Sequence, residues 1–330
     1  MIKSVSLHIV DIGGDNVNYK GRKIIEMKTP IDYNKMTEII EEFSQKYDFL
    51  QIGKLGNSVF DRPIPLLKLG NGEKRVIYIG SHHGSEWITS GLLLRFINEY
   101  CELYKTNGSV EGISVENIFK SVEINIIPML NPDGVEISIN GVSEDNILYS
   151  RLLTMNQKSR DFSHWQANGR GVDLNHNYNF GFSEYKELER GQGIVGGAST
   201  RYSGEYPESE PETGYLCNYI RFYGDFFGAL TLHTQGEEIY YKSGDNCPLQ
   251  SERIAKYISR LCGYSLGKAE GMSAYGGFTD WFIKEFDRPS FTVECGKGKN
   301  PLPITDLPMI YIRIRRMLFE LPLIFCRNFR

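Results

Sequence analysis

Two histidines and a glutamate lie where an apolar run gives way to polar residues. The stretch reads VIYIGSHHGSEWITSGLLL, so His83 and Glu86 stand three residues apart, directly after an expected strand. Imidazole nitrogens and carboxylate oxygens both bind zinc, but a chain with six histidines and many glutamates contains an H-x-x-E pair easily by chance. The pair therefore indicates a metal site only if distant segments supply a third ligand and a base.

Two later strand ends carry groups of the required kind. His233 stands near the end of the apolar run ALTLHT, and Glu294 ends the run SFTVE. In open α/β sheets, chemistry gathers beyond the carboxyl ends of the strands, so we expect these side chains to lie near His83 and Glu86. Two imidazoles and one carboxylate can hold zinc with a position open for water, and a further carboxylate can take a proton from that water.

Alternating strand-like and helix-like stretches must position these groups. Helical apolar spacing at Met36, Ile39, Ile40 and Phe43 predicts a helix after Pro30. The runs SVFDRPIPLLKLG and KRVIYIG, separated by an Asn-Gly turn, indicate a hairpin. SVEINIIPML, FFGALTLHT and RPSFTVECG alternate with helical stretches, and TDLPMIYIRIRRMLFELPLIF predicts a closing helix with a Thr/Asp cap.

This order predicts an α/β fold with one main domain. We expect a mixed, largely parallel twisted sheet flanked by helices on both faces. Residues 1–32 are predicted to form a small β-rich extension, and residues 33–330 the catalytic domain. The connection from KRVIYIG to FFGALTLHT takes about 150 residues with long loops, and loops of that length are usually functional.

Composition excludes several classes of protein. The chain has 330 residues, 41% of them hydrophobic, and a net charge of −4, which does not indicate a nucleic-acid partner. No apolar run approaches a membrane span, and polar residues interrupt the first apolar stretch of the N-terminus, so no secretory signal is expected. The six cysteines are scattered, which is typical of free core thiols. We therefore expect a cytoplasmic protein of undetermined oligomeric state.

The motifs resemble those of the zinc carboxypeptidase family of the carboxypeptidase A type. The matching segments occur in the family's order over roughly residues 50–300 and read HGSEWITS, NPDG, RGVDLNHN, SEPET, LHTQGEE, GGFTDW and FTVECG. Within the family, HGSEWIT, LHTQGEEIYY, YGGFTDWF and ECGKGKNPLP are most similar to the branch that cleaves γ-D-glutamyl–diaminopimelate bonds of bacterial wall peptides. The resemblance implies the fold of that family and a peptidoglycan peptide as the substrate.

The resemblance also assigns roles to individual residues. It implies that one zinc ion is bound by His83, Glu86 and His233. Asp173 in GVDLN matches the carboxylate that orients the first histidine, and such a partner fixes the tautomer of a ligand. Glu294 matches the general base, and an unpaired glutamate inside FTVEC would be costly to bury without a role.

Neighbouring groups of the same types are rival candidates. His82 does not fit the ligand motif because Ser85 stands three residues beyond it, so we interpret it as a hydrogen-bonded histidine at a strand end. Glu237 and Glu238 are rival carboxylates for the base, but a solvated loop explains them equally well.

The chain departs from its relatives at the substrate carboxylate. Typical members read LNRN, whereas this chain reads LNHN, with Asn175 and His176 at the positions of the carboxylate-binding pair. Arginine offers a permanent charge and two parallel donors, while histidine offers at most one donor per edge and titrates near neutrality. Asn175 is expected to bind substrate still, with His176 a weaker and pH-sensitive clamp. The demand for a free C-terminal carboxylate is then looser, which permits endopeptidase action.

A second departure concerns the arginine that stabilises the tetrahedral oxyanion. In the register of the family, Gln166 stands at that position in HWQANGRGVDLN. Loss of one such donor costs about 10²–10³ in rate. Gln166 can donate one neutral hydrogen bond, and Arg160 or Arg170 is the alternative, although surface roles explain both arginines as well.

Two further residues are candidates for substrate binding. The family pattern places Thr279 at the floor of the side-chain pocket, where a neutral hydroxyl is compatible with the polar head of diaminopimelate. Tyr275 lies three residues after the position of the family's mobile tyrosine, so it is either a substrate contact or an aromatic residue packed in a loop.

Three functional hypotheses follow. The first is zinc-dependent hydrolysis of a γ-D-glutamyl–meso-diaminopimelate amide, with Glu294 as the base. The second is a metallocarboxypeptidase or an amide deacylase with another substrate. The third is a catalytically weakened zinc or wall-peptide binding protein, motivated by Gln166 and His176. Recycling of imported fragments, action during sporulation and release on lysis are all compatible with a chain that lacks a signal peptide.

Overall fold

The fold was analysed in a computed structural model that describes residues 25–327. Most of the predicted β-rich extension over residues 1–32 lies outside the described residues, and its described part contains no strand. Within the described residues, no helix has the combination of length and apolar character that a bilayer crossing requires.

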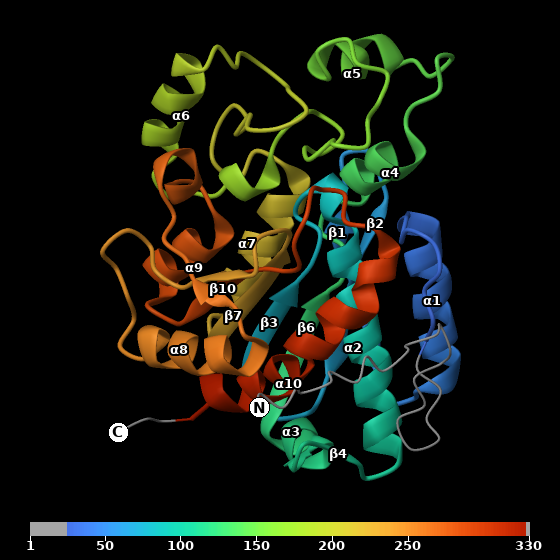
Figure 1. Cartoon of the computed structure of the whole chain (residues 1–330), viewed down its shortest axis with the longest axis vertical. Coiled ribbons are helices and arrows are strands. Elements are labelled where there is room, and N and C mark those ends of the chain that lie inside the picture. The colour runs from blue at the N-terminus through green and yellow to red at the C-terminus, as the bar shows by residue number, and fades with distance from the viewer. Residues whose placement is uncertain (1–24, 328–330) are drawn as a thin grey trace, which may run out of the picture.

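An eight-stranded mixed sheet forms the centre of the molecule, with the strand order β1-β2-β6-β3-β7-β10-β8-β9 (Figure 1). The strands β6, β3, β7 and β10 are mutually parallel, while β1, β2 and β8 run antiparallel to their neighbours nearer the centre. The strands of this sheet are β1 Gln51–Asn57, β2 Pro63–Leu69, β3 Lys74–Ile79, β6 Val122–Ile127, β7 Phe226–His233, β8 Glu238–Tyr240, β9 Ser265–Leu266 and β10 Ser290–Glu294. The predicted fold class is confirmed.

Helices cover both faces of the sheet. They are α1 Tyr33–Lys46, α2 Ile88–Lys105, α3 Val115–Ser121, α4 Pro132–Asn140, α5 Tyr149–Met155, α6 Phe182–Gly191, α7 Pro211–Tyr223, α8 Ser251–Cys262, α9 Phe278–Phe286 and α10 Leu307–Phe325. A separate pair, β4 Ser109–Val110 and β5 Ile113–Ser114, lies beside α3. The helix predicted after Pro30 is α1, and the predicted closing helix is α10, although the Asp306 side chain makes no capping hydrogen bond.

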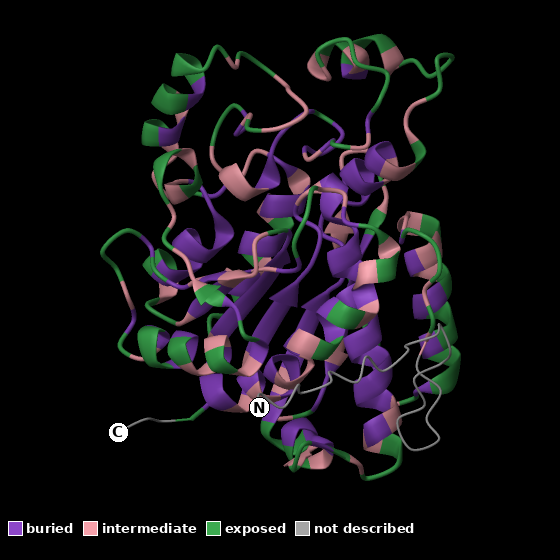
Figure 2. Ribbon diagram, viewed as in Figure 1, coloured by how far each residue is buried: buried purple, intermediate pink, exposed green. Residues whose placement is uncertain are grey.

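The two faces of the central strands alternate along the sequence. Val76 and Tyr78 of β3 belong to the core beneath α2, α8 and α10, whereas Ile77 and Ile79 pack with α7 and α9 on the opposite face. The central strands are therefore buried on both sides, as Figure 2 shows, and this explains their nearly continuous apolar runs.

The predicted hairpin across Asn71 and Gly72 is wrong. The strands β2 and β3 do not pair, because β6 lies between them, and the hairpin is instead formed by β1 and β2. The Asn-Gly segment crosses over the start of β6, where the Asn71 amide donates to the Phe119 carbonyl at 2.8 Å. A Cβ atom on Gly72 would lie 2.1 Å from the Ser121 carbonyl carbon, so glycine serves this close crossing rather than a hairpin turn.

Candidate metal centre

Three candidate ligands meet at the carboxyl ends of two neighbouring parallel strands. His83 follows β3, Glu86 ends the 3-10 turn Gly84–Glu86 before α2, and His233 is the last residue of β7. Because Ile79 of β3 pairs with Thr231 of β7, the two strand ends lie side by side. The ligand atoms of His83, Glu86 and His233 all lie within 4.8 Å of one another. The tertiary structure thus joins residues 147 positions apart.

The donor set suits a zinc ion. Glu86 Oε1 lies 2.9 Å from His83 Nδ1, and Glu86 Oε2 lies 3.0 Å from His233 Nδ1, so both imidazoles turn the same nitrogen toward one carboxylate. The Thr234 amide and the Asn300 side chain also donate to Glu86, at 3.2 and 3.4 Å. Two imidazole nitrogens and one carboxylate are the protein ligands of a zinc site that keeps a position open for reaction.

Asp173 fixes the orientation of the first histidine. Its Oδ1 atom lies 3.1 Å from His83 Nε2, which leaves Nδ1 directed at Glu86. Asp173 also accepts the backbone amides of Arg201 at 2.9 Å and Asn175 at 3.2 Å. Burial by itself would raise the pKa of Asp173, but His83 and the accepted hydrogen bonds hold it well below its usual range. The carboxylate is therefore ionised over the whole physiological pH range.

A glycine and an asparagine hold the histidine loop in place. The Gly84 amide donates to the Gln166 carbonyl at 2.9 Å, and a Cβ atom on Gly84 would lie 2.3 Å from the Gly134 carbonyl oxygen. The Asn131 side chain donates to the His82 carbonyl at 3.0 Å and also reaches the carbonyls of the 166–167 segment. The sequence HGSEW folds this way because glycine alone allows the loop to approach α4 so closely.

Glu294 lies beside the candidate ligands. It ends β10, where it is the parallel partner of His233, and it faces Glu238 across the antiparallel partner β8. Burial raises the pKa of Glu294 well above its usual range, and the nearby charge of Glu86 raises it further. The rival carboxylates are engaged elsewhere: Glu237 pairs with Lys297 and Arg313, and Glu238 accepts the Tyr240 hydroxyl at 2.7 Å.

His82 lies outside the ligand group. Its side chain is fully buried, its Nε2 atom lies 2.9 Å from the Tyr178 hydroxyl, and its ring stacks on His233 with the centroids 5.2 Å apart. Burial lowers the pKa of His82 well below its ordinary value, so the ring is neutral. This residue packs behind the candidate metal centre and does not point into it.

Both alternatives to Gln166 are engaged in ion pairs. Arg160 pairs with Glu144 at 2.9 Å, and Arg170 pairs with Glu210 at 3.0 Å. The Gln166 side chain accepts a hydrogen bond from the Thr200 hydroxyl through Oε1. Within the described residues its amide NH₂ group makes no hydrogen bond, so it can donate to a substrate oxygen.

A cavity of about 110 Å³, with polar and apolar lining residues, adjoins Glu294. Its lining includes Asn175, Thr279, Asp280 and Lys242, together with Tyr240, Ala269, Ser273, Gly277, Phe278, Thr292 and Glu294. The Thr279 hydroxyl contacts the Thr292 hydroxyl at 2.9 Å, and Asn175 Oδ1 accepts the Phe278 amide at 3.2 Å. The cavity therefore brings together two of the predicted substrate residues, Asn175 and Thr279, with the predicted base.

His176 and Tyr275 do not line this cavity. The His176 ring stacks on Tyr185 with the centroids 4.2 Å apart, and its Nδ1 atom lies 2.9 Å from the Tyr275 carbonyl. Burial lowers the pKa of His176, which makes the ring neutral near pH 7. The Tyr275 ring packs over Gly181, where an added Cβ atom would lie 2.5 Å from it.

Sequence reasoning did not single out Asp280, Asn300 or Arg201, although all three contact the site region. Asp280 stands directly after Thr279 in the quoted motif, so the motif itself carried that signal. Asn300 lies in the quoted segment ECGKGKNPLP and donates to Glu86. Arg201 contacts Asp173 through its backbone N–H, and no sequence motif indicates such a backbone contact.

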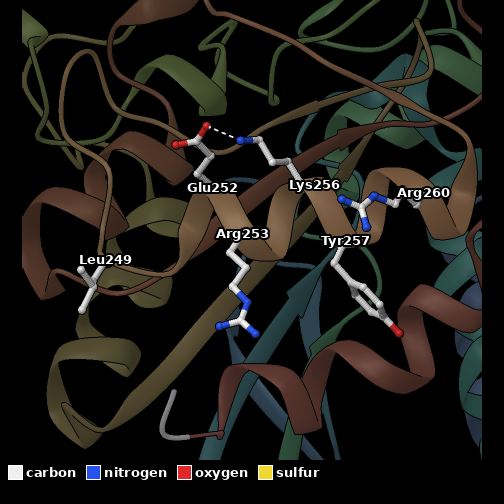
Figure 3. A pocket seen from close by; sticks show the side chains of 6 residues that line it. All are labelled: Leu249, Glu252, Arg253, Lys256, Tyr257 and Arg260. Carbon is white, nitrogen blue, oxygen red and sulfur yellow. Dashed lines mark ion pairs between the residues drawn. The ribbon is translucent and has the colours of Figure 1, made fainter. Parts of the chain in front are cut away.

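A second hollow, of about 580 Å³, runs along α8 (Figure 3). It is lined by Leu249, Glu252, Arg253, Lys256, Tyr257 and Arg260. Glu252 and Lys256 pair with each other across one helical turn at 2.8 Å, and both are at least half exposed. None of the candidate metal ligands or substrate residues lines this hollow, so it is a surface of the covering helix and not part of the site.

Comparison with known proteins agrees with this arrangement. The family model described as zinc carboxypeptidase matches residues 36–312. A γ-D-glutamyl-L-diamino acid endopeptidase 1 from Lysinibacillus sphaericus is 35% identical over 289 residues, which cover 88% of this chain and 71% of that protein. The uncharacterized protein YqgT from Bacillus subtilis strain 168 is 32% identical over 289 residues, covering 87% of this chain and 76% of that one.

A solved structure shows the same fold. Bovine thrombin-activatable fibrinolysis inhibitor, in complex with tick carboxypeptidase inhibitor, superposes with a TM-score of 0.69 at 19% identity, and the match covers 91% of this chain and 98% of that chain. The family match extends over most of the chain and includes every candidate zinc ligand. The chain therefore belongs to the zinc carboxypeptidase family of metallopeptidases.

Proposed function

We propose that this protein hydrolyses the amide bond between γ-D-glutamate and meso-diaminopimelate in bacterial cell-wall peptides. The observation that carries the proposal is the cavity beside Glu294, whose lining holds a buried carboxylate and hydroxyl groups instead of an apolar floor. The 35% identical relative is named for action on a γ-D-glutamyl-L-diamino acid bond, which supports the same substrate class. The catalytic unit is assigned to residues 33–330, with residues 1–32 as an extension.

Each residue of the centre receives a role in this proposal. His83, Glu86 and His233 hold one zinc ion, and Asp173 fixes the His83 ring by accepting from Nε2. A zinc ion held there would supply Lewis-acid chemistry, which polarises a carbonyl and lowers the pKa of water. Glu294, at the strand end beside His233, takes the proton of the attacking water and delivers it to the leaving amine. The free NH₂ group of Gln166 donates a hydrogen bond to the carbonyl oxygen of the scissile amide, which gains negative charge during the reaction.

The cavity suits the side chain of a diamino acid. Asp280 is only 7% exposed, lines the cavity, and makes no ion pair with a basic residue in the described part of the chain. A buried carboxylate without a cation is costly, and an incoming ammonium group would relieve that cost. We assign Asp280 to the ammonium group of the diaminopimelate head, with Thr279 beside it and Asn175 toward the scissile bond.

His176 by itself binds a terminal carboxylate more weakly than an arginine at this position would. His176 is neutral near pH 7 and its Nδ1 atom is engaged by the Tyr275 carbonyl, so it lacks the permanent charge of the arginine at this position in typical members. Tyr275 packs in its loop, and we propose no catalytic role for it.

The test is incubation of the zinc-loaded protein with L-Ala-γ-D-Glu-meso-diaminopimelate beside ordinary peptides with free C-termini. Mass spectrometry should detect diaminopimelate release from the wall peptide and little release from the others. Cleavage of the ordinary peptides alone would replace this proposal with a carboxypeptidase of other specificity. Binding of the wall peptide without cleavage by the zinc-loaded protein would indicate a binding protein.

A further inference from the structure

The segment 198–201 ties together three polar groups of the candidate site. The Ser199 carbonyl accepts a hydrogen bond from the backbone N–H of Gln166 at 2.9 Å, and the Thr200 hydroxyl donates to the side-chain oxygen of Gln166. The next backbone amide, that of Arg201, donates to Asp173 Oδ2 at 2.9 Å. This segment thus fixes both the oxyanion candidate and the carboxylate that orients His83.

The backbone of Arg201 is held from two sides. Its backbone N–H donates a hydrogen bond to the Asp173 carboxylate, and its carbonyl accepts one from the Tyr185 hydroxyl at 2.9 Å. Tyr185 in turn stacks on the His176 ring. Arg201 adopts φ 63°, a left-handed conformation that is uncommon for a side-chain-bearing residue and that these hydrogen bonds maintain. Arg201 is therefore fixed between the metal centre and the residue that replaces the typical carboxylate-binding arginine.

The guanidinium group of Arg201 is available to an anion. The guanidinium donates to a neutral amide, from Nη1 to Gln192 Oε1 at 3.2 Å, and no carboxylate of the described residues forms an ion pair with it. Arg160 and Arg170 differ from Arg201 in this respect, because each of them forms an ion pair with a glutamate. Arg201 is linked to His176 through Tyr185, whose hydroxyl donates to the Arg201 carbonyl and whose ring stacks on the His176 ring.

We propose that Arg201 binds the carboxylate of the substrate residue on the leaving side of the scissile bond. It would supply the permanent charge and the two parallel donors that His176 lacks. In typical members one position provides this charge, whereas here the charge comes from a separate loop that is attached to Asp173. The inference rests on the proposed function, because it assumes a peptide whose leaving residue carries a free carboxylate.

The test pairs a substitution with a matched change in the substrate. Arg201→Gln removes the charge but keeps the backbone hydrogen bonds to Asp173 and Tyr185, and Arg201→Lys keeps the charge but loses the fork. The substrates are L-Ala-γ-D-Glu-meso-diaminopimelate and the same peptide with the L-centre carboxylate of diaminopimelate converted to a carboxamide. Arg260→Gln is the matched control, because Arg260 is exposed on α8 and lines the second hollow, whose lining includes no candidate site residue (Figure 3).

We expect kcat/KM on the acid peptide to fall about 10- to 100-fold in Arg201→Gln, chiefly through KM. On the carboxamide peptide the variant and the parent should differ less than about 2-fold, which is within the effect of a single weak surface contact. On the acid peptide, the kcat/KM of Arg201→Lys should lie between the values of the parent and of Arg201→Gln, and the kcat/KM of Arg260→Gln should match that of the parent. Added salt should raise KM for the acid peptide in the parent more than in Arg201→Gln. An equal loss on both peptides, or no loss on either, would overturn the inference.

Failure of the proposed function has a different signature. In that case the parent protein leaves both wall peptides intact. The inference is then decided by calorimetric titration of the zinc-loaded parent and Arg201→Gln with meso-diaminopimelate, the expected product. Weaker binding to Arg201→Gln supports the assignment, whereas equal binding or absent binding to both proteins refutes it. Equal melting temperatures of the two proteins show that the difference is not one of folding.

Discussion

Glu294 and His233 are direct partners across two parallel strands, each at the last residue of its strand. This register sets a carboxylate beside an imidazole ligand without placing it in the ligand group itself. The Glu86 side chain bonds both histidines, whereas the Glu294 side chain makes no hydrogen bond to either of them within the described residues.

Glu294→Gln is expected to abolish turnover while zinc remains bound. The amide preserves the shape of the side chain but cannot take a proton, and loss of a general base costs about 10²–10⁴ in rate. Turnover is measured as diaminopimelate release, and metal by elemental analysis of the same sample. Glu237→Gln is the control, since Glu237 pairs with Lys297 and should leave turnover unchanged. A Glu294→Gln variant with parental activity would remove this residue from the mechanism.

The two adjacent histidines should respond differently to substitution. His83→Ala removes a ligand and should reduce bound zinc from one ion per chain to a small fraction of that. His82→Ala should keep the zinc, because this ring bonds Tyr178 and lies outside the ligand group, but it should lower the melting temperature by leaving a buried cavity. Metal analysis after dialysis, with calorimetric melting of each protein, tests both statements. The opposite pattern of zinc content would disprove the ligand assignment.

Asp173→Asn should weaken zinc binding without eliminating it. The carboxylate holds His83 through Nε2, and removal of such a partner typically costs about 10- to 100-fold in metal affinity. Competition with a chromophoric chelator gives the affinity of the variant and of the parent. Arg160→Gln, which alters an exposed ion pair with Glu144, should leave the affinity unchanged.

The titration of Asp280 should make substrate affinity depend on pH. Burial raises the pKa of Asp280 to about 7, while the neighbouring Ser243 hydroxyl acts in the opposite direction. Below that pH the carboxyl group is protonated and cannot attract an ammonium group, so KM for the diaminopimelate peptide should fall as the pH rises through about 7. Asp280→Asn should remove this pH dependence and raise KM.

A substrate analogue isolates that interaction. A peptide that carries 2-aminopimelate in place of diaminopimelate lacks the second amino group, so its KM should be nearly the same for the parent and for Asp280→Asn. If the parent shows the same KM for both peptides throughout the range from pH 6 to 8, Asp280 does not bind the ammonium group.

Most residues of the candidate site could be predicted from the spacing of the motifs, but the contacts around them could not. His83, Glu86, His233 and Glu294 could be predicted because each stands at the end of an apolar strand, and strand ends of a parallel sheet meet at one edge. The pairing partners of β2 and β3 could not be predicted from the Asn71-Gly72 turn signal, because β6, some fifty residues later in the chain, enters between the two strands. His176 and Tyr275 were candidates for substrate contact by position alone, and neither lines the cavity.

The sequence by itself determined the family, the fold class and the ligand types, because these depend on residue identity, periodicity and order along the chain. The tertiary structure decided which groups remain available for chemistry. Arg160 and Arg170 pair with glutamates, and Glu237 pairs with basic side chains, whereas the Arg201 guanidinium bonds the neutral amide of Gln192 and forms no ion pair within the described residues. These pairings join segments far apart in the chain, and the distances between such side chains are fixed only when the whole core has packed.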